Sequence, residues 1–360
     1  MKIVFCGGGT GGHITPMLAM ADILRQNYKN AVFYFIGRKN GKENDAIRRA
    51  GFTPIEIEIC GLGRSISPSN IRVVFRALAA KREAKRILKD LSPDIVIGTG
   101  GYVSWPVLSA ARSLGIKTAI HESNAAPGLV TRLCCRWVDL VMLGYDAAKT
   151  RLPRCRSVIT GNPVRGTVGK IPRLRARDLL GIPMDSTVVL SFGGSLGATV
   201  INRVMTDIFE NERENPKILY IHATGRKEYD SYKSIRKKNV RILPYIEDMP
   251  LYLAAADITV TRCGAMTLAE LSAVGVVPIL IPSPNVTANH QYENARVLSD
   301  RGTAVMITED ELSGERLKKE VYRLIENPSE RTKIKAAILQ KRGPVDRNIL
   351  AAIDTVLRGR

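Results

Sequence analysis

The sequence contains few of the residues that mark metalloproteins and disulfide-bonded secreted modules. Among 360 residues there are four histidines and six cysteines, and no two cysteines form a Cys-x-x-Cys pair. Histidine-rich metal centres, zinc ribbons and thioredoxin-like sites are therefore unsupported. Scattered cysteines in a chain of this length instead predict free thiols in a reducing compartment.

Long hydrophobic runs are also missing. The longest spans residues 273–282, whereas a membrane-spanning helix needs roughly twenty apolar residues. The first strand-like residues reach Gly7 before an apolar signal region develops, so we expect no export signal. If the protein works at a membrane, we expect it to lie on the surface.

Aromatic and acidic residues are scarce relative to basic ones. Aromatics make up 6% of the chain, and 54 Lys and Arg outnumber 34 Asp and Glu, giving a net charge of +20. Such a charge attracts nucleic acid or anionic membranes. Because the aromatics do not interleave with the basic residues, no stacking platform for bases is evident, and we expect no nucleic-acid partner.

Hydrophobic residues, at 45%, are ordinary for a globular protein, and the length predicts about two domains. Short apolar runs alternate with helical patterns, which predicts an α/β fold with parallel sheets in two Rossmann-like, doubly wound domains. The expected strands are residues 2–6, 32–36, 94–98, 118–121, 140–143 and 158–160, then 188–192, 218–221, 240–243, 258–261, 277–281 and 304–307.

A break at residues 161–165, Gly-Asn-Pro-Val-Arg, predicts the domain boundary. We expect a first domain over residues 1–162 and a second over 163–343. The last amphipathic segment, residues 345–357, follows Gly343 and Pro344, and we expect a helix over 344–358 that packs back on the first domain.

A glycine-rich loop directly follows the first expected strand. Residues 7–13 read Gly-Gly-Gly-Thr-Gly-Gly-His, and Thr15-Pro16 suits the start of a helix over 16–26. Backbone N–H groups of such a loop can approach an anion. The loop also fits G-x-G-x-x-G, so an NADP-dependent oxidoreductase is an alternative, although no ribose-binding acid follows about twenty residues on.

Two more glycine loops follow expected strands, at residues 98–102 and 193–198. Ligands of open α/β sheets bind at the carboxyl ends of the strands. Three such loops split over two domains predict a ligand in the cleft between the domains. The alternative is that they are tight turns between strand and helix.

At this point the sequence resembles the MurG family of glycosyltransferases. The resemblance rests on residues 8–13 (Gly-Gly-Thr-Gly-Gly-His), 121–124 (His-Glu-Ser-Asn), 161–165, 193–195 (Gly-Gly-Ser) and 262–267 followed by Glu270. It implies a GT-B fold, with two domains facing a deep cleft. It also implies inverting transfer of N-acetylglucosamine from UDP-N-acetylglucosamine to the C4 hydroxyl of undecaprenyl-pyrophosphoryl-N-acetylmuramoyl-pentapeptide, in peptidoglycan synthesis. A UDP-N-acetylglucosamine 2-epimerase would share the fold and the donor.

Such a displacement needs a base for the attacking hydroxyl and stabilisation of the departing diphosphate. His13 is the first candidate base, because a neutral imidazole suits that role near pH 7, and Glu122 is the second. The alternative for His13 is a helix cap. The chain has no Asp-x-Asp motif, so we expect neither a metal nor another cofactor, and cations and helix N-termini to meet the diphosphate charge.

The resemblance also implies a set of substrate-binding residues. Glu270 would accept the ribose hydroxyls, with a capping box formed with Thr267 as the structural alternative. The backbone of Ile246 would contact uracil. The remaining residues of the set are Thr10, Gly11, Gly12, Asn124, Arg165, Ser195, Asn202, Ala265, Met266, Leu268, Ala269 and Gln291.

Residues 71–90 predict a basic amphipathic helix. Ile71, Phe75 and Leu78 lie on one face, and the cations include Arg76, Arg82 and Arg86. Such a helix can rest on anionic lipid, or its apolar stripe can pack in the core. The lipid-linked acceptor favours peripheral attachment to the cytoplasmic face of the cell membrane.

Overall fold

The structure is a computed structural model. It describes residues 1–59, 69–194 and 197–359, with the backbone alone at Lys42 and residues 69–74. The chain divides into two units, one made of residues 1–166 and 344–360 and the other of residues 167–343. The sequence-based boundary, at 162/163, lies four residues before this division.

Unit 1 is built on a parallel sheet with the strand order β3-β2-β1-β4-β5-β6-β7 in its described part. The strands are β1 (Lys2–Cys6), β2 (Val32–Arg38), β3 (Pro54–Ile57), β4 (Ile95–Gly98), β5 (Lys117–Glu122), β6 (Leu140–Leu143) and β7 (Ser157–Ile159). The helices between them are α1 (Gly11–Asn27), α2 (Lys42–Arg49), α3 (Ser69–Leu91), α4 (Ser104–Ser113), α5 (Leu129–Cys134) and α6 (Ala147–Thr150).

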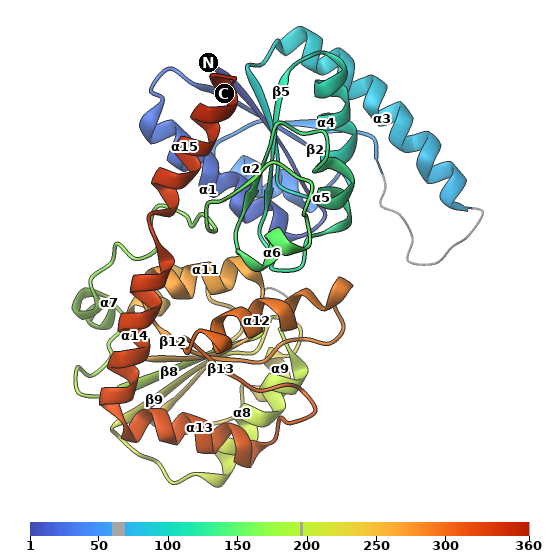
Figure 1. Cartoon of the computed structure of the whole chain (residues 1–360). Coiled ribbons are helices and arrows are strands. Elements are labelled where there is room, and N and C mark those ends of the chain that lie inside the picture. Colours follow the sequence, from blue (N-terminus) through green and yellow to red (C-terminus); the bar gives the residue numbers. More distant parts are fainter. Residues whose placement is uncertain (60–68, 195–196, 360) are drawn as a thin grey trace. The chain divides into compact units, whose positions relative to one another are not determined.

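The strands of unit 1 bury side chains on both faces, as a doubly wound sheet requires. Along β1, Ile3 and Phe5 pack with α1 and α15 (Val345–Leu357), whereas Val4 and Cys6 pack with α3 and α4. The residue period of two therefore separates two apolar layers. Figure 1 shows helices on both faces of this sheet.

The last helix, α15, belongs to unit 1 although unit 2 precedes it in the chain. Its apolar stripe, which includes Val345, Ile349 and Ile353, is buried against α1 and the strands β5 and β6. The Tyr28 hydroxyl donates a hydrogen bond to the Asp354 carboxylate and joins α15 to the end of α1. The residues at positions 345–357 thus complete one face of the first sheet.

Unit 2 repeats the architecture, with the parallel strand order β10-β9-β8-β11-β12-β13 in its described part. The strands are β8 (Thr187–Phe192), β9 (Ile218–Ala223), β10 (Val240–Leu243), β11 (Ile258–Thr261), β12 (Val277–Leu280) and β13 (Val305–Met306). The helices are α7 (Arg173–Leu179), α8 (Thr199–Asn211), α9 (Tyr229–Tyr232), α10 (Met249–Ala255), α11 (Ala265–Val274), α12 (His290–Asp300), α13 (Gly314–Glu326) and α14 (Pro328–Arg342), with a 3₁₀ turn at Thr287–Asn289. The helices α8 and α13 pack on one face of this sheet.

Each sheet reverses its strand order at one point, between β1 and β4 in unit 1 and between β8 and β11 in unit 2. Connections leave in opposite directions there, which opens a crevice at the carboxyl ends of the two strands. The glycine loops after β1 and β4 and the segments after β8 and β11 all follow these strands. The topology therefore brings the predicted binding motifs to the switch point of each sheet.

The structure corrects two sequence-based expectations. The edge strand β3 was not predicted, because it has only four residues and begins at Pro54, which an edge strand tolerates. Helix α1 begins at Gly11 and not near Thr15, so Thr10 occupies the N-cap position and Pro16 lies inside the helix. Pro16 falls in the second turn, where its missing N–H removes one helical hydrogen bond.

Candidate active site

The loop between β1 and α1 is shaped by several glycines that serve different purposes. A Cβ atom at Gly7 would lie 2.2 Å from the Thr99 hydroxyl, and one at Gly8 would lie 2.4 Å from the Glu43 carboxylate. These two glycines are needed for packing within the chain. In contrast, a Cβ at Gly11 would meet nothing within 4 Å, and Gly12 is similarly open. Packing does not explain Gly11 and Gly12, whereas the approach of a ligand to the start of α1 would.

The second glycine loop supports the first. The Thr99 hydroxyl donates to the backbone carbonyl of His13 over 2.7 Å. Gly100 and Gly101 have positive φ angles of 99° and 74°, and a Cβ at Gly100 would lie 2.8 Å from the His13 ring. The absence of side chains lets this loop press against the imidazole. Its glycines are therefore explained by contact with His13, which favours the tight-turn interpretation for this loop.

Glu43 is a buried carboxylate that the sequence analysis missed. It is 1% exposed, and it accepts hydrogen bonds from the backbone N–H groups of Arg38 (3.0 Å) and Gly9 (3.4 Å). It lies in the first turn of α2 and holds the first glycine loop through the N–H group of Gly9. Nothing in the local sequence distinguishes it from an ordinary acidic residue at a helix N-terminus.

The hydrogen bonds of His13 define its tautomer. Its Nδ1 lies 3.0 Å from the carbonyl oxygen of Gly8. A backbone carbonyl only accepts hydrogen bonds, so Nδ1 carries the proton and, in the neutral ring, Nε2 is the basic nitrogen. Thr10 Oγ1 lies 3.2 Å from the same Nδ1. The neutral ring of His13 therefore has the tautomer in which Nε2 can accept a proton.

Two of the other histidines are unsuited to proton transfer with a substrate. His121 and His222 are fully buried. Burial lowers the pKa of both, that of His222 to about 4. His222 Nδ1 lies 2.7 Å from the buried Ser191 hydroxyl. In unit 1 this leaves His13, which is partly exposed, as the histidine that can reach a ligand.

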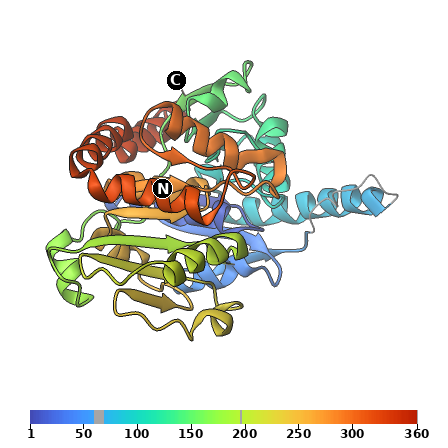
Figure 2. The ribbon, with the colours of Figure 1, turned by 90° about the horizontal axis from the view of Figure 1, so that it is seen from below.

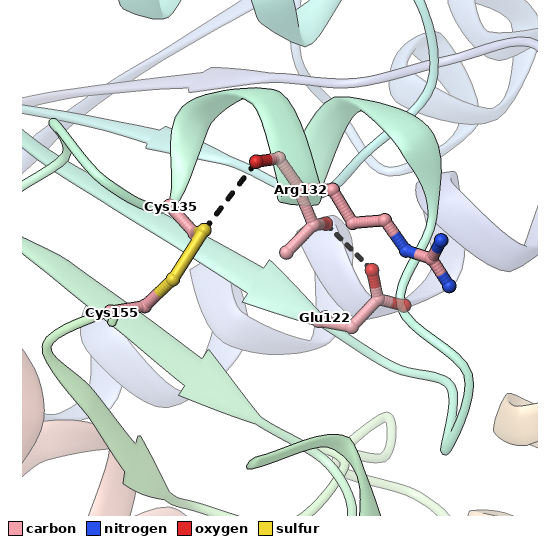
Figure 3. Close-up of a disulfide and its surroundings, with 5 residues drawn as sticks. Glu122, Arg132, Cys135 and Cys155 are labelled. Carbon is pink, nitrogen blue, oxygen red and sulfur yellow. Dashed lines mark hydrogen bonds between the residues drawn. A yellow bond between two sulfur atoms is a disulfide. The ribbon is translucent and has the colours of Figure 1, made fainter. Parts of the chain in front are cut away.

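Glu122, the second candidate base, is held in a dense hydrogen-bond network at the end of β5. Its Oε1 accepts from the backbone N–H (3.0 Å) and the Nδ2 (3.1 Å) of Asn124. Its Oε2 accepts from the Gly128 N–H (2.9 Å) and the Thr131 hydroxyl (2.6 Å). Figure 3 shows Glu122 below the helix that carries Arg132. At 5% exposure and with four donors, the carboxylate shapes the loop that presents Asn124.

The cysteines depart from the expectation of free thiols. Cys135, just after α5, is joined by a disulfide to Cys155, which precedes β7 (Figure 3). Sequence spacing could not give this pairing, because the two residues are brought together by the packing of separate segments. Cys6, Cys134 and Cys263 are free and buried, and burial raises the pKa of each thiol.

Arg165 lies at the end of the first part of unit 1 and is exposed. Burial raises the pKa of the Asp22 carboxyl on α1, and the charges of Arg25 and Arg165 partly oppose that rise. Arg165 is thus accessible to an anionic ligand.

In unit 2, α11 presents its N-terminus directly after β11. Gly264 is the N-cap residue and supplies no side-chain cap. The first N–H groups of a helix lack intrahelical partners, so those of Ala265, Met266 and Thr267 are available to an anion. The alternative of a Thr267–Glu270 capping box is wrong, because a capping box pairs the N-cap with the third helical residue and Glu270 is the sixth.

Side chains of α12 fix the segment that leads into α11. Gln291 Oε1 accepts from the N–H groups of Cys263 (3.2 Å) and Ser283 (3.0 Å). Asn294, which is fully buried, donates to the Cys263 carbonyl over 3.1 Å. Gln291 can therefore contact a sugar only through its Nε2. Asn294 is a positioning residue that the sequence analysis missed, since a single Asn in a helix carries no signal.

Several other predicted contacts are constrained by burial. Asn202 is fully buried and its Nδ2 donates to Thr224 and Glu228, so any effect on a diphosphate would be indirect. The buried side chain of Ile246 leaves only its backbone for a ligand. Leu268 has a buried side chain and an N–H bonded to Gly264, which argues against direct contact. Ala269 is partly exposed within α11, and Ser195 lies outside the described residues.

Comparisons with known proteins identify the class. The glycosyltransferase family 28 N-terminal domain matches residues 3–143, and the glycosyltransferase family 28 C-terminal domain matches residues 188–346. Together with two doubly wound units, these matches define a glycosyltransferase with the GT-B fold. A crystal structure from Listeria monocytogenes, described as that of a UDP-N-acetylglucosamine 2-epimerase, shares the fold. Its sequence identity is 16% and the TM-score is 0.72, over 100% of this chain and 97% of that one.

Closer relatives narrow the class to a family. A Bacillus licheniformis protein is 40% identical over 346 residues, which cover 94% of each chain, and a Thermoanaerobacter sp. protein is 40% identical over 93% of this chain and 94% of its own. Both are named UDP-N-acetylglucosamine–N-acetylmuramyl-(pentapeptide) pyrophosphoryl-undecaprenol N-acetylglucosamine transferase. The crystal structure of Acinetobacter baumannii MurG matches with a TM-score of 0.77 at 26% identity, covering 98% of this chain and 99% of that one. The chain belongs to the MurG family.

Proposed function

We propose that this chain transfers N-acetylglucosamine from UDP-N-acetylglucosamine to the C4 hydroxyl of undecaprenyl-pyrophosphoryl-N-acetylmuramoyl-pentapeptide. The observation that carries the proposal is the 40% identity with relatives of that name over 94% of the chain. The sequence relatives favour the transferase over the epimerase, with which the likeness extends to the fold alone. The reaction belongs to peptidoglycan synthesis.

We assign the acceptor to unit 1. In the proposed step the acceptor oxygen forms a bond to the anomeric carbon of the donor while the bond from that carbon to the diphosphate oxygen breaks. The proton of the hydroxyl passes to Nε2 of His13, whose Nδ1 is held on the Gly8 carbonyl. The N–H groups at Thr10, Gly11 and Gly12 would bind an anionic group of the acceptor. Asn124, held on Glu122, would orient a sugar.

We assign the donor to unit 2. The departing UDP carries away the bonding electron pair, and the N–H groups at the start of α11 and the charge of Arg165 would stabilise its diphosphate. Glu270 would accept the ribose hydroxyls, and the backbone of Ile246 would contact uracil. Gln291 and Ser195 would contact the donor at its sugar and diphosphate, respectively.

The proposal is tested by incubating the purified protein with UDP-N-acetylglucosamine, with and without the lipid-linked acceptor. We expect UDP release and a glycosylated lipid only when the acceptor is present. Release of UDP and a 2-epimerised sugar without acceptor would instead identify an epimerase. Micromolar binding of NADP(H), with no transfer, would revive the oxidoreductase alternative.

We also infer that the protein attaches peripherally to the cytoplasmic face of the membrane through α3. In the described part of the chain, no helix is long and apolar enough to cross a bilayer. The C-terminal half of α3 packs through Ala80, Ala84 and Leu88, whereas Phe75 is 68% and Leu78 is 41% exposed. Figures 1 and 2 show the N-terminal half of α3 projecting from unit 1. Phe75 and Leu78, two residues of the predicted apolar stripe, are thus exposed and not packed in the core, which favours contact with lipid. The side chain of Ile71, the third, lies outside the described residues.

Reversing the charge of α3 is expected to release the protein from anionic vesicles. The substitutions Arg76→Glu, Arg82→Glu and Arg86→Glu remove three cations, each worth about 1 kcal/mol near such a surface, so binding should weaken by about 100-fold or more. Vesicle sedimentation at increasing salt measures this. The control carries Lys29→Glu, Arg49→Glu and Arg347→Glu, all exposed on unit 1. Equal loss in both variants would mean that net charge, and not α3, drives attachment.

A further inference from the structure

A second cationic site lies on unit 1, beside the disulfide. A cavity of about 440 Å³ is lined by Arg132, Arg136, Arg151 and Arg154, together with Cys135 and Cys155. It adjoins the segments that precede β6 and β7. The predicted site residues from His13 to Asn124 lie instead at the carboxyl ends of β1 and β5, which are the opposite ends of the strands. The cavity is therefore separate from the site described above.

The walls of this cavity are held in place by the fold. Leu152 is 4% exposed and anchors the 151–155 segment in the core layer that contains Cys134 and Cys135. The Leu152 N–H donates to the Lys149 carbonyl, and the Cys155 N–H donates to that of Leu152 (3.2 Å). The Cys135–Cys155 bond joins this segment to the end of α5. Arg136 and Arg154 are each next to a bridged cysteine, so the bridge brings the two arginines to one cavity.

The guanidinium groups do not all play the same part. Arg132 Nε donates to the Pro127 carbonyl over 3.0 Å, and Figure 3 shows its side chain directed away from the disulfide. Arg136, Arg151 and Arg154 are exposed. No acidic residue is among the residues that line the cavity. Arg136 and Arg154 thus bring two exposed guanidinium groups to one wall of a cavity whose lining contains no carboxylate.

We propose that this cavity binds a phosphate-bearing anion, through a phosphate monoester or diphosphate group. The planar guanidinium matches phosphate oxygens with paired hydrogen bonds, and clustered arginines are the usual recognition element for such groups. The cavity exceeds the size of one phosphate, so a larger attached group fits. The anion comes either from a soluble phosphate compound or from a lipid headgroup. The site is independent of the proposed transfer reaction.

The first experiment titrates the full-length protein with inorganic diphosphate by calorimetry, with saturating UDP present to occupy the donor site. The variant Arg136→Gln with Arg154→Gln should bind diphosphate at least tenfold more weakly than the unchanged protein. The matched control, Arg49→Gln with Arg347→Gln, loses the same charge elsewhere on unit 1 and should stay within twofold. Unchanged turnover in the standard assay shows that both variants are folded.

The second experiment identifies a lipid source. Phosphatidylcholine vesicles containing either phosphatidic acid or phosphatidylglycerol, at equal surface charge, are sedimented with each protein. A preference for phosphatidic acid that disappears in Arg136→Gln with Arg154→Gln supports a lipid headgroup, whereas loss of diphosphate binding alone supports a soluble ligand. The proposal is overturned if both variants match the unchanged protein in both experiments, or if the unchanged protein binds neither probe.

Discussion

Replacing His13 with alanine is expected to lower kcat by about 10²–10⁴-fold, the usual contribution of a positioned general base. Affinity for UDP-N-acetylglucosamine should persist, because the groups assigned to the donor are those of unit 2 and Arg165, and do not include His13. Steady-state kinetics and calorimetry with the donor measure the two quantities separately. Near-normal turnover in His13→Ala would rule out the role of base and leave the residue a structural role, through contacts such as those with Gly8 and the Gly100–Gly101 turn.

The variant Glu122→Gln serves as the comparison. Each oxygen of Glu122 accepts two hydrogen bonds. In Glu122→Gln an NH₂ group replaces one oxygen, and because it is itself a donor it cannot accept the two hydrogen bonds made there. We expect a loss of at least about 2 kcal/mol in the free energy of unfolding, and a smaller fall in kcat than for His13→Ala. A larger fall in kcat for Glu122→Gln than for His13→Ala would transfer the role to Glu122.

The second large effect is expected at Glu270. Removing its carboxylate by Glu270→Ala should weaken donor binding by roughly ten- to a hundredfold, since hydrogen bonds to a charged group contribute about 1.5–3 kcal/mol. Calorimetric titration with UDP-N-acetylglucosamine measures the change. The residue is partly exposed on the second turn of α11, so the fold should survive its truncation.

A matched substitution separates this contact from a general effect of charge. Glu315, exposed in the first turn of α13, is also a helical glutamate of unit 2. Glu315→Ala should leave donor affinity unchanged, while Glu270→Gln, which keeps the shape and loses the charge, should fall between. Identical affinities for Glu270→Ala and the unchanged protein would remove Glu270 from the donor site.

The sequence predicted the fold well because the strands carry strong local signals. The runs at β6 and β11 are continuous apolar or β-branched segments, and those at β1 and β10 contain a single basic residue each. In all four the predicted and observed bounds coincide. The strand β3 carries no such signal: it is short, begins with proline, and depends on pairing with β2. The predicted start of α1 was too late, because Thr15-Pro16 resembles the start of a helix. The helix in fact begins at Gly11 and includes Gly12.

The site was predictable at the level of motifs and less so at the level of single atoms. Spacing indicated that His13 and Glu122 follow strands. It could not show that the Glu122 carboxylate accepts four hydrogen bonds from nearby Asn124, Gly128 and Thr131. Nor could it reveal Glu43 or Asn294, whose roles arise from tertiary contacts with backbone groups distant in sequence. The disulfide between Cys135 and Cys155 is of the same kind.

The packing of α15 on unit 1 has a consequence for folding during synthesis on the ribosome. The apolar layer formed by α1 and β1 lacks Val345, Ile349, Ala352, Ile353 and Val356 until α15 has been synthesised. Unit 2 can fold as soon as residues 167–343 have left the ribosome. Unit 1 is synthesised first, but one apolar face of its sheet stays exposed until α15 follows. Removal of residues 345–357 would therefore destabilise unit 1 and not unit 2. During synthesis the exposed layer is a surface on which nascent chains can aggregate or chaperones can bind.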